Sequence, residues 1–454
     1  MKVKLLTAVL CCAFLHTQAQ SDSVMFKRIA DEIMLHGTCY ENLRVLCKTI
    51  GHRLSGTPQA AEAVKWGQKA LEQAGADKVW LQPVDVPHWV RGQEKLSLRF
   101  KGDKSFKEVP MLSIGNTVGT EGKPMQAAVV MVNDIAEFNK LDEKDIKGNI
   151  IFFNYRFRQD IINTFEGYGD AGKYRWLAPN VAAAKGAAGV IIRSVSTGED
   201  DHPHTGSMRY ADTVKPIPAV AVGNMTANLL EKECRKGGVS AEIQSTCKML
   251  GMVRSYNVIG EITGTEHPEK IVLVSGHLDS WDVGEGAHDD GAGCVQSIEV
   301  IRTLKALGIR PKYTIRAVLF MNEENGVKGG YAYADSAKAR KENHILAIES
   351  DAGGFSPRGI GLDMKPEKKE KILAYRKLFY PYGVYDFEHE EGGVDISLLQ
   401  RQGVPVAGLL PDPQRYFDLH HTRNDVFEQV NHRELKLGAV TLAGLVYLVS
   451  THGL

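Results

Sequence analysis

The feature that most constrains the fold is a series of short apolar runs in the C-terminal half of the chain. They alternate with helical patterns such as GAGCVQSIEVIRTLKALG, residues 291–308. Runs that are apolar on both faces and separated by helices are typical of a parallel sheet covered on both sides. Right-handed crossovers then predict an α/β fold with a doubly wound, mostly parallel sheet flanked by helices. The runs are KIVLVSG, YTIRAVLFMN, HILAIES and VPVAGLL, at residues 270–276, 313–322, 344–350 and 404–410.

Side chains that bind metals follow each of these runs. Ligands of doubly wound sheets bind just outside the carboxyl ends of the strands, so these side chains should gather at one edge. Asp289 and Asp290 begin the loop into the helix after the first run. The others are His277 and Asp279 after the first run, Glu323 and Glu324 after the second, Asp351 after the third, and His420 and His421 after the fourth.

This convergence predicts a metal site. Carboxylates crowded at one rim repel each other and raise their own pKa values unless a cation is present. Mixed imidazole and carboxylate groups suit zinc better than calcium or magnesium. A bridging carboxylate can hold two ions about 3.5–4 Å apart, and the ligand number fits two ions better than one. One acid must stay off the metal to take a proton from water and pass it to a leaving amine.

At these residues the chain resembles the superfamily of zinc-dependent co-catalytic aminopeptidases and glutamate carboxypeptidases. The resemblance covers nearly all of the chain after residue 20. It implies a zinc exopeptidase-like fold, two Zn²⁺ per chain and an inserted protease-associated α/β module. The motifs are GHLDSWDVGEGAHDDGAG, NEENGVKGG, ESDAGG and DLHHTRND, which begin at residues 276, 322, 349 and 418.

The resemblance also implies roles for single residues. Glu323 takes the position of the general base. Asp279 takes that of the acid that accepts a hydrogen bond from the second nitrogen of His277 and orients it. A cis peptide is expected between Asp289 and Asp290. The ligand positions are filled by His277, Asp289, Glu324, Asp351 and His421, with Asp289 bridging both ions.

Other residues near the motifs do not reveal which side chains bind the substrate. His288 stands where relatives carry other residues and is not expected to be a ligand, whereas His420 is open to contact with substrate. The segment HEEGGVDISLL, residues 389–399, is an expected pocket segment. Its acids do not decide whether the site holds an ammonium or a carboxylate, so the substrate-binding residues stay unknown. These acids are Glu390, Glu391 and Asp395.

Several functions are compatible with this pattern. The resemblance favours an exopeptidase of dipeptides or short peptides, with a dipeptidase or carboxypeptidase-like activity. An aminopeptidase with the same site is the alternative. A binding ectodomain is disfavoured because every ligand position and the base are filled. A glutaminyl cyclase is disfavoured by the inserted module and the paired ligand set.

Changes in the sequence pattern divide the chain into three parts. Residues 1–20 place basic residues before the apolar run LLTAVLCCAFL, which is the layout of a signal peptide and too short for a permanent membrane span. We therefore expect an exported protein, secreted or periplasmic. The catalytic domain is predicted to be discontinuous, at residues 21–108 and 252–454. The inserted module is predicted at residues 109–251.

Two local patterns within these parts give predictions of their own. Thr57 and Pro58 are suited to begin a helix that ends near Gly75. His202 and His204 lie in a polar loop, for which we expect exposure to solvent rather than a metal site.

Composition excludes some partners. Lys+Arg and Asp+Glu each number 55, so no net charge favours nucleic acid. No segment after residue 20 is predicted to span a membrane, and a homodimer is open by analogy with relatives. Cysteine pairs such as Cys39–Cys47 or Cys234–Cys247 are permitted in an oxidising compartment, but we expect small buried free thiols instead.

Overall fold

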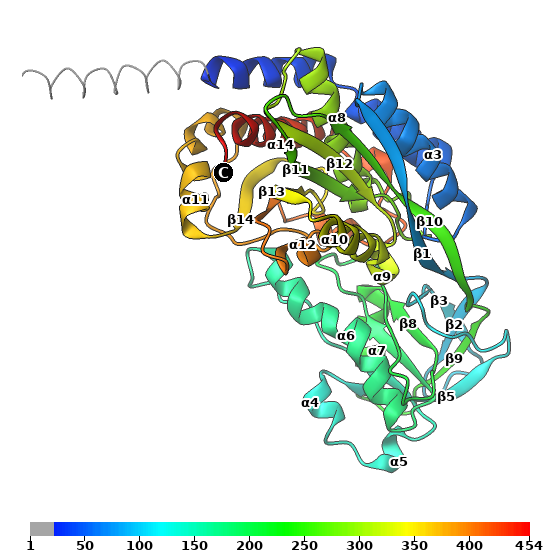
Figure 1. The fold of residues 1–454 in the computed structure, drawn as a ribbon. Coiled ribbons are helices and arrows are strands. Elements are labelled where there is room, and N and C mark those ends of the chain that lie inside the picture. Colours follow the sequence, from blue (N-terminus) through cyan, green and yellow to red (C-terminus); the bar gives the residue numbers. More distant parts are fainter. Residues whose placement is uncertain (1–21) are drawn as a thin grey trace, which may run out of the picture.

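The computed structural model describes residues 22–454 and has two modules, one above the other in Figure 1. The larger module is built on a seven-stranded sheet. Its strands, in spatial order, are β1 (Lys78–Val90), β10 (Lys248–Ile262), β12 (Tyr313–Phe320), β11 (His267–His277), β13 (Asn343–Glu349), β15 (Val406–Pro411) and β14 (Pro357–Asp363).

The four predicted apolar runs form the centre of this sheet. Strands β12, β11, β13 and β15 are parallel neighbours, so their carboxyl ends share one edge. The outer strands β1, β10 and β14 are antiparallel to their neighbours. The predicted α/β class is therefore confirmed, and the parallel character belongs to the central strands.

Helices cover both faces of the sheet. They include α2 (Cys39–Val45), α3 (Pro58–Gln73), α8 (Ala292–Ala306), α10 (Lys328–Arg340), α11 (Pro366–Leu373), α12 (Ser397–Gln400) and α14 (His432–His452). The predicted start of α3 is confirmed, since the Thr57 side chain accepts a hydrogen bond from the Ala60 amide. The predicted stop is confirmed as well: α3 ends at Gln73, and Gly75 has a positive φ of 88°.

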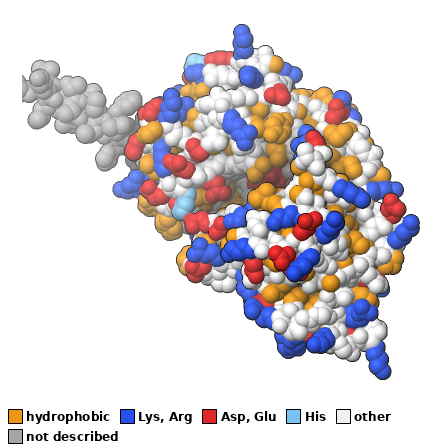
Figure 2. Space-filling view, turned by 90° about the horizontal axis from the view of Figure 1, so that it is seen from below, with side chains coloured by type: hydrophobic (Ala, Val, Ile, Leu, Met, Phe, Trp, Pro, Cys, Tyr) orange, Lys and Arg blue, Asp and Glu red, His pale blue; other side chains and the backbone are white. Residues whose placement is uncertain are grey.

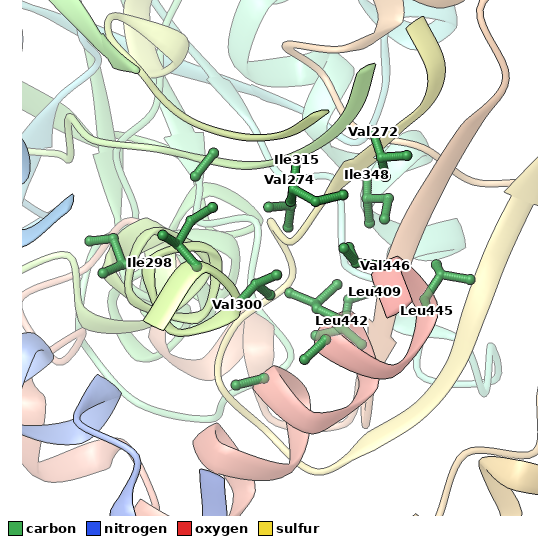
Figure 3. Close-up of a cluster of buried hydrophobic side chains, with 14 of the residues drawn as sticks. Val272, Val274, Ile298, Val300, Ile315, Ile348, Leu409, Leu442, Leu445 and Val446 are labelled. Carbon is green, nitrogen blue, oxygen red and sulfur yellow. The ribbon is translucent and has the colours of Figure 1, made fainter. Parts of the chain in front are cut away.

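The main core lies between the sheet and helices α8 and α14. Branched aliphatic side chains from both layers interdigitate there, as Figure 3 shows. Helix α14 is long and apolar enough to cross a membrane, but 78% of its apolar segment is buried within the protein. Burial against the sheet accounts for that composition. Core residues labelled in Figure 3 include Val272, Val274, Ile298, Ile315, Ile348, Leu442 and Val446.

The smaller module is built on an eight-stranded mixed sheet. Its strands, in spatial order, are β3 (Lys107–Val109), β2 (Glu94–Arg99), β9 (Ser240–Ser245), β5 (Met125–Val132), β6 (Ile150–Phe153), β7 (Gly189–Arg193), β8 (Ala219–Val222) and β4 (Leu112–Ser113). Its helices are α4 (Ile135–Phe138), α5 (Glu143–Ile146), α6 (Thr164–Ala184) and α7 (Asn224–Cys234).

The sheets correct the predicted boundaries of the insertion. β2 and β3 pair within the second sheet rather than the first, so the insertion begins before residue 109. β10 already starts at Lys248 in the first sheet, so the insertion ends before residue 251. The short β2 pairs with β9, which lies near the far end of the insertion in the sequence, and no local pattern reveals that partner. We call residues 91–247 the inserted module.

The cysteines of the described residues are free thiols. Cys39, Cys47, Cys247 and Cys294 are buried, and Cys234 is partly buried. The structure therefore has neither of the two disulfides that the sequence permitted. Residues 1–20, with the predicted signal peptide, lie outside the residues that can be described.

Candidate metal centre and catalytic site

The predicted site residues come together at the carboxyl edge of the parallel strands. His277 is the last residue of β11, and Glu323 and Glu324 begin the short helix α9 (Glu323–Gly326) after β12. Asp351 lies just after the end of β13. His421 lies in the loop after β15, residues 412–425, which we call the histidine loop. Asp289 lies in the turn before α8.

One half of the site forms around His277. Its Nε2 lies 3.1 Å from Oδ1 of Asp289 and 3.3 Å from Oδ1 of Asp351. The His277 side chain is almost fully buried, and Asp289 and Asp351 are mostly buried. We call these three residues the His277 half.

The other half forms around His421, which faces the second carboxylate oxygen of Asp289. Nε2 of His421 lies 3.1 Å from Oδ2 of Asp289 and 3.2 Å from Oε2 of Glu324. The backbone amide of Trp281 donates to Oε1 of Glu324 and orients that carboxylate. We call His421, Asp289 and Glu324 the His421 half. Asp289 therefore faces one imidazole with each of its oxygens.

The electrostatics of the site fit a bound cation. Burial raises the pKa of Glu324 well above its usual value, and the Asp289 carboxylate raises it further. Burial lowers the pKa of His277, but Asp351 and Asp289 more than offset this, so the net shift is upward. Buried carboxylates held this close are costly without a positive charge among them. Their oxygens and the two imidazoles form the mixed donor set that zinc prefers.

Glu323 lines a cavity together with several ligand candidates, but it takes part in none of the close contacts that define the two halves. Burial raises the pKa of Glu323 to about 8, and the neighbouring Asp351 and Asp289 carboxylates add to the rise. A cation bound nearby would lower this pKa, because it favours the charged carboxylate. Glu323 is therefore placed to exchange protons with a molecule in the cavity.

The predicted hydrogen bond between His277 and the carboxylate of Asp279 is wrong, because the backbone carbonyl of Asp279 takes that place. Nδ1 of His277 lies 3.1 Å from the backbone carbonyl oxygen of Asp279, but 3.8 Å from its carboxylate. The carboxylate instead accepts hydrogen bonds from the amides of Asn322 and Glu323, at 2.7 and 3.0 Å. Asp279 therefore orients the ring of His277 through its main chain, and it orients the segment that carries Glu323 through its side chain.

The turn that carries Asp289 is fixed by two further acids. The expected cis peptide between Asp289 and Asp290 is present. The Asp290 carboxylate accepts from the amides of His277 and Gly293, both at 2.9 Å. The Asp425 carboxylate accepts from the amides of His288 and Asp289, at 2.7 and 3.1 Å. Sequence reasoning missed this role of Asp425, although it closes the motif DLHHTRND.

The two ambiguous histidines lie differently. Both ring nitrogens of His288 are engaged, with the Gly354 amide and the Gln429 carbonyl, and its ring stacks on Phe355. This agrees with the expectation that His288 is no ligand. His420 lines the cavity, with Nε2 3.7 Å from Oδ2 of Asp289. It therefore stays available to a substrate or to a metal.

The polar loop of the inserted module is not solvated as expected. His204 and Thr205 are buried, because the loop packs against the histidine loop. The Thr205 amide donates to the backbone carbonyl of His421 at 3.0 Å. These partners lie far apart in the sequence, and no signal in it links them.

A cavity of about 1140 Å³ lies over the site and between the two modules. Glu391, Gly393 and Val394 from the expected pocket segment line it. The face seen in Figure 2 is hollowed near its centre, with hydrophobic side chains beside the hollow. Exposed apolar residues that line the cavity are Trp176, Met249, Met252, Tyr331 and Val394.

Comparisons with known proteins agree with the resemblance. A model of peptidase family M28 matches residues 257–446. Carboxypeptidase Q of Xenopus laevis is 34% identical over 96% of this chain and 91% of its own length. Carboxypeptidase Q of Homo sapiens is 34% identical over 90% of this chain and 85% of its own length.

Solved structures share the fold. The crystal structure of a peptidase M28 precursor from Shewanella amazonensis has a TM-score of 0.90 and 31% identity, over 95% of this chain and 97% of that one. A zinc aminopeptidase from Bacillus subtilis has a TM-score of 0.64 and 20% identity, over 90% and 94% of the two chains. The second likeness supports the fold alone.

Proposed function

Because the chain belongs to peptidase family M28, we propose that this metallopeptidase is a di-zinc exopeptidase of dipeptides or short peptides. The observation that carries the proposal is the position of the Asp289 carboxylate. One of its oxygens faces His277 and the other faces His421, both at 3.1 Å. A carboxylate shared in this way is suited to bridge two ions.

The ligand set would consist of two overlapping groups. His277, Asp289 and Asp351 would hold one ion, and His421, Asp289 and Glu324 would hold the other. Zinc held there supplies Lewis acidity, which lowers the pKa of water and polarises the carbonyl of a substrate.

The protein residues would do the rest of the chemistry. Glu323 takes a proton from the attacking water and delivers it to the nitrogen of the leaving group. Asp279 holds the amide of Glu323 and, through its own carbonyl, the ring of His277. The carboxylates of the two halves are mostly buried, which strengthens their electrostatic interactions.

The charges around the cavity support a short substrate with two free ends. Arg209 and Lys328 are exposed cations that line it, and Glu391 is an exposed acid that lines it. A dipeptide carries both an ammonium and a carboxylate, and these side chains complement one of each. We therefore propose a dipeptidase or carboxypeptidase-like activity, with an aminopeptidase as the alternative that Glu391 favours.

A panel of dipeptides and end-blocked dipeptides, assayed with and without a chelator, tests this function. We expect cleavage of free dipeptides that the chelator abolishes and added zinc restores. Loss of cleavage on blocking the carboxylate indicates recognition of the C-terminus. Loss only on blocking the amine indicates an aminopeptidase. Cleavage that resists complete metal removal would refute the di-zinc proposal.

We also propose that residues 1–20 are a signal peptide and that the mature enzyme is exported. The basic and apolar layout of these residues supports this proposal. N-terminal sequencing of protein recovered outside the cytoplasm tests it. The identity of residues 91–247 as a protease-associated module stays a prediction. The homodimer stays a prediction as well, and sedimentation of the full chain tests it.

A further inference from the structure

We propose that the inserted module positions His421, through the backbone of Thr205 and the guanidinium of Arg175. This inference rests on the proposed function, because it gives His421 a metal to bind. It assigns the module a part in building the metal site, beyond covering the cavity. The positioning residues are Thr205 and Arg175, and neither belongs to the ligand set.

The first observation is that the inserted module packs against the histidine loop and forms hydrogen bonds with it. Phe157, Ala171 and Val195 of the module form one buried cluster with Tyr416, Phe417 and Leu419 of the loop. The Ser196 hydroxyl donates to the Phe417 carbonyl at 2.9 Å, and the Thr197 hydroxyl donates to the Asp418 carboxylate at 2.7 Å. The backbone just before His420 and His421 is therefore fixed from the module side.

The second observation concerns the ring of His421 itself. Its Nδ1 lies 3.3 Å from the carbonyl oxygen of Thr205, while the Thr205 amide bonds the carbonyl of His421 at 3.0 Å. The Thr205 hydroxyl is tied in turn to the Ser113 carbonyl at 2.9 Å. A ring nitrogen that faces a carbonyl carries the proton, so the lone pair lies on the other nitrogen. Nε2 then presents that lone pair toward Asp289 and Glu324, as a metal ligand requires.

The third observation is that Arg175 holds the accepting carbonyl. Its Nη1 donates to the oxygen of Thr205 at 3.3 Å, and its Nη2 donates to the hydroxyl of Tyr168. The same Nη1 lies 3.4 Å from Nδ1 of His421, and each of the two nitrogens lies 3.3 Å from the Thr205 oxygen, which accepts from both when Nδ1 carries the proton. Gly206 allows this approach, because a Cβ there would collide with the guanidinium of Arg175. The carbonyl is thus held by buried groups of the module.

The matched control is another buried arginine of the same module. Arg193 donates to Asn154 at 2.8 Å and to Asn224 at 3.1 Å, and it makes no hydrogen bond to Thr205 or His421 within the described residues. Arg175→Met and Arg193→Met each remove a buried guanidinium from the module. Only the first removes a group that contacts Thr205.

The experiment measures zinc bound by the full chain at a series of buffered free zinc concentrations. We expect Arg175→Met to weaken the more sensitive of the two zinc sites by about 10- to 100-fold, the usual effect of losing a partner of a ligand. The other site should keep its wild-type affinity. Arg193→Met should keep both affinities, and Arg175→Lys should recover part of the loss because lysine can still donate to the carbonyl.

Wild-type affinities at both sites in a folded Arg175→Met variant would overturn the inference, and so would an equal loss in Arg193→Met. Thr205→Val guards against misfolding, since it keeps the size of the side chain and removes only the hydroxyl link. We expect a smaller loss in the same direction, and unchanged zinc binding in this variant would count against the inference. Peptide cleavage by the wild type is scored separately. A wild type that binds two zinc ions without cleaving refutes only the proposed function.

Discussion

The two halves of the metal centre are built in different ways. The His277 half is local, because a strand end, the following carbonyl of Asp279 and neighbouring strand ends determine it. The His421 half depends on a long loop and on a second module that is distant in the sequence. One half therefore follows from sheet topology, whereas the other requires the inserted module to be folded and docked.

The largest effect on turnover is expected at Glu323, which is a ligand candidate in neither half. Glu323→Gln should lower kcat by roughly 100-fold or more, because a neutral amide cannot take the proton of water. Zinc content and thermal stability should stay near those of the wild type. Steady-state kinetics with parallel metal analysis checks this, and wild-type turnover would remove Glu323 from the mechanism.

Single ligand losses separate the halves. His277→Ala and His421→Ala should each reduce bound zinc from two ions to about one per chain, since each removes the only imidazole of its half. Metal analysis after dialysis against buffered zinc gives the count. Asp335→Ala, an exposed position on α10, is a control that should keep both ions. Two ions retained in either histidine variant would show that its half is misplaced.

Asp425→Asn should weaken both halves together. In the wild type, each carboxylate oxygen of Asp425 accepts from one backbone amide, that of His288 or that of Asp289. The asparagine side chain keeps one acceptor oxygen for one of these amides and places its NH₂ group against the other. Because Asp289 would serve both ions in the proposed site, we expect roughly tenfold weaker binding at each. The same zinc titration that is used for Arg175→Met reports this. A loss confined to one site would mean that Asp289 does not bridge.

The smallest effect is expected far from both halves. Thr57→Ala removes the side-chain cap of α3 and should lower the free energy of unfolding by about 1 kcal/mol. Urea unfolding measures this change, and Thr57→Ser should largely restore the cap. Zinc affinities should not change, so any shift at either site would indicate coupling between the metal centre and α3.

The sequence predicted what local pattern and topology determine. The apolar runs fixed the central strands, and the order of those strands brought His277, Glu324 and Asp351 to one edge. The start of α3 followed from Thr57 and Pro58 because capping is local.

What could not be predicted depends on contacts distant in sequence. β2 joins the second sheet because β9 pairs with it, so the expected boundary at residue 109 is wrong. His204 is buried where the inserted module meets the histidine loop. The carboxylate of Asp279 turns toward the amides after β12 rather than toward His277, a choice of atoms that residue spacing does not encode.

The most direct test of the central claim is anomalous diffraction at the zinc edge from crystals of the wild-type protein grown with zinc. We expect two peaks about 3.5–4 Å apart, one on each side of the Asp289 carboxylate. One peak beside His277 and the other beside His421 would agree with it. A single peak, or two peaks that do not share Asp289, would contradict it.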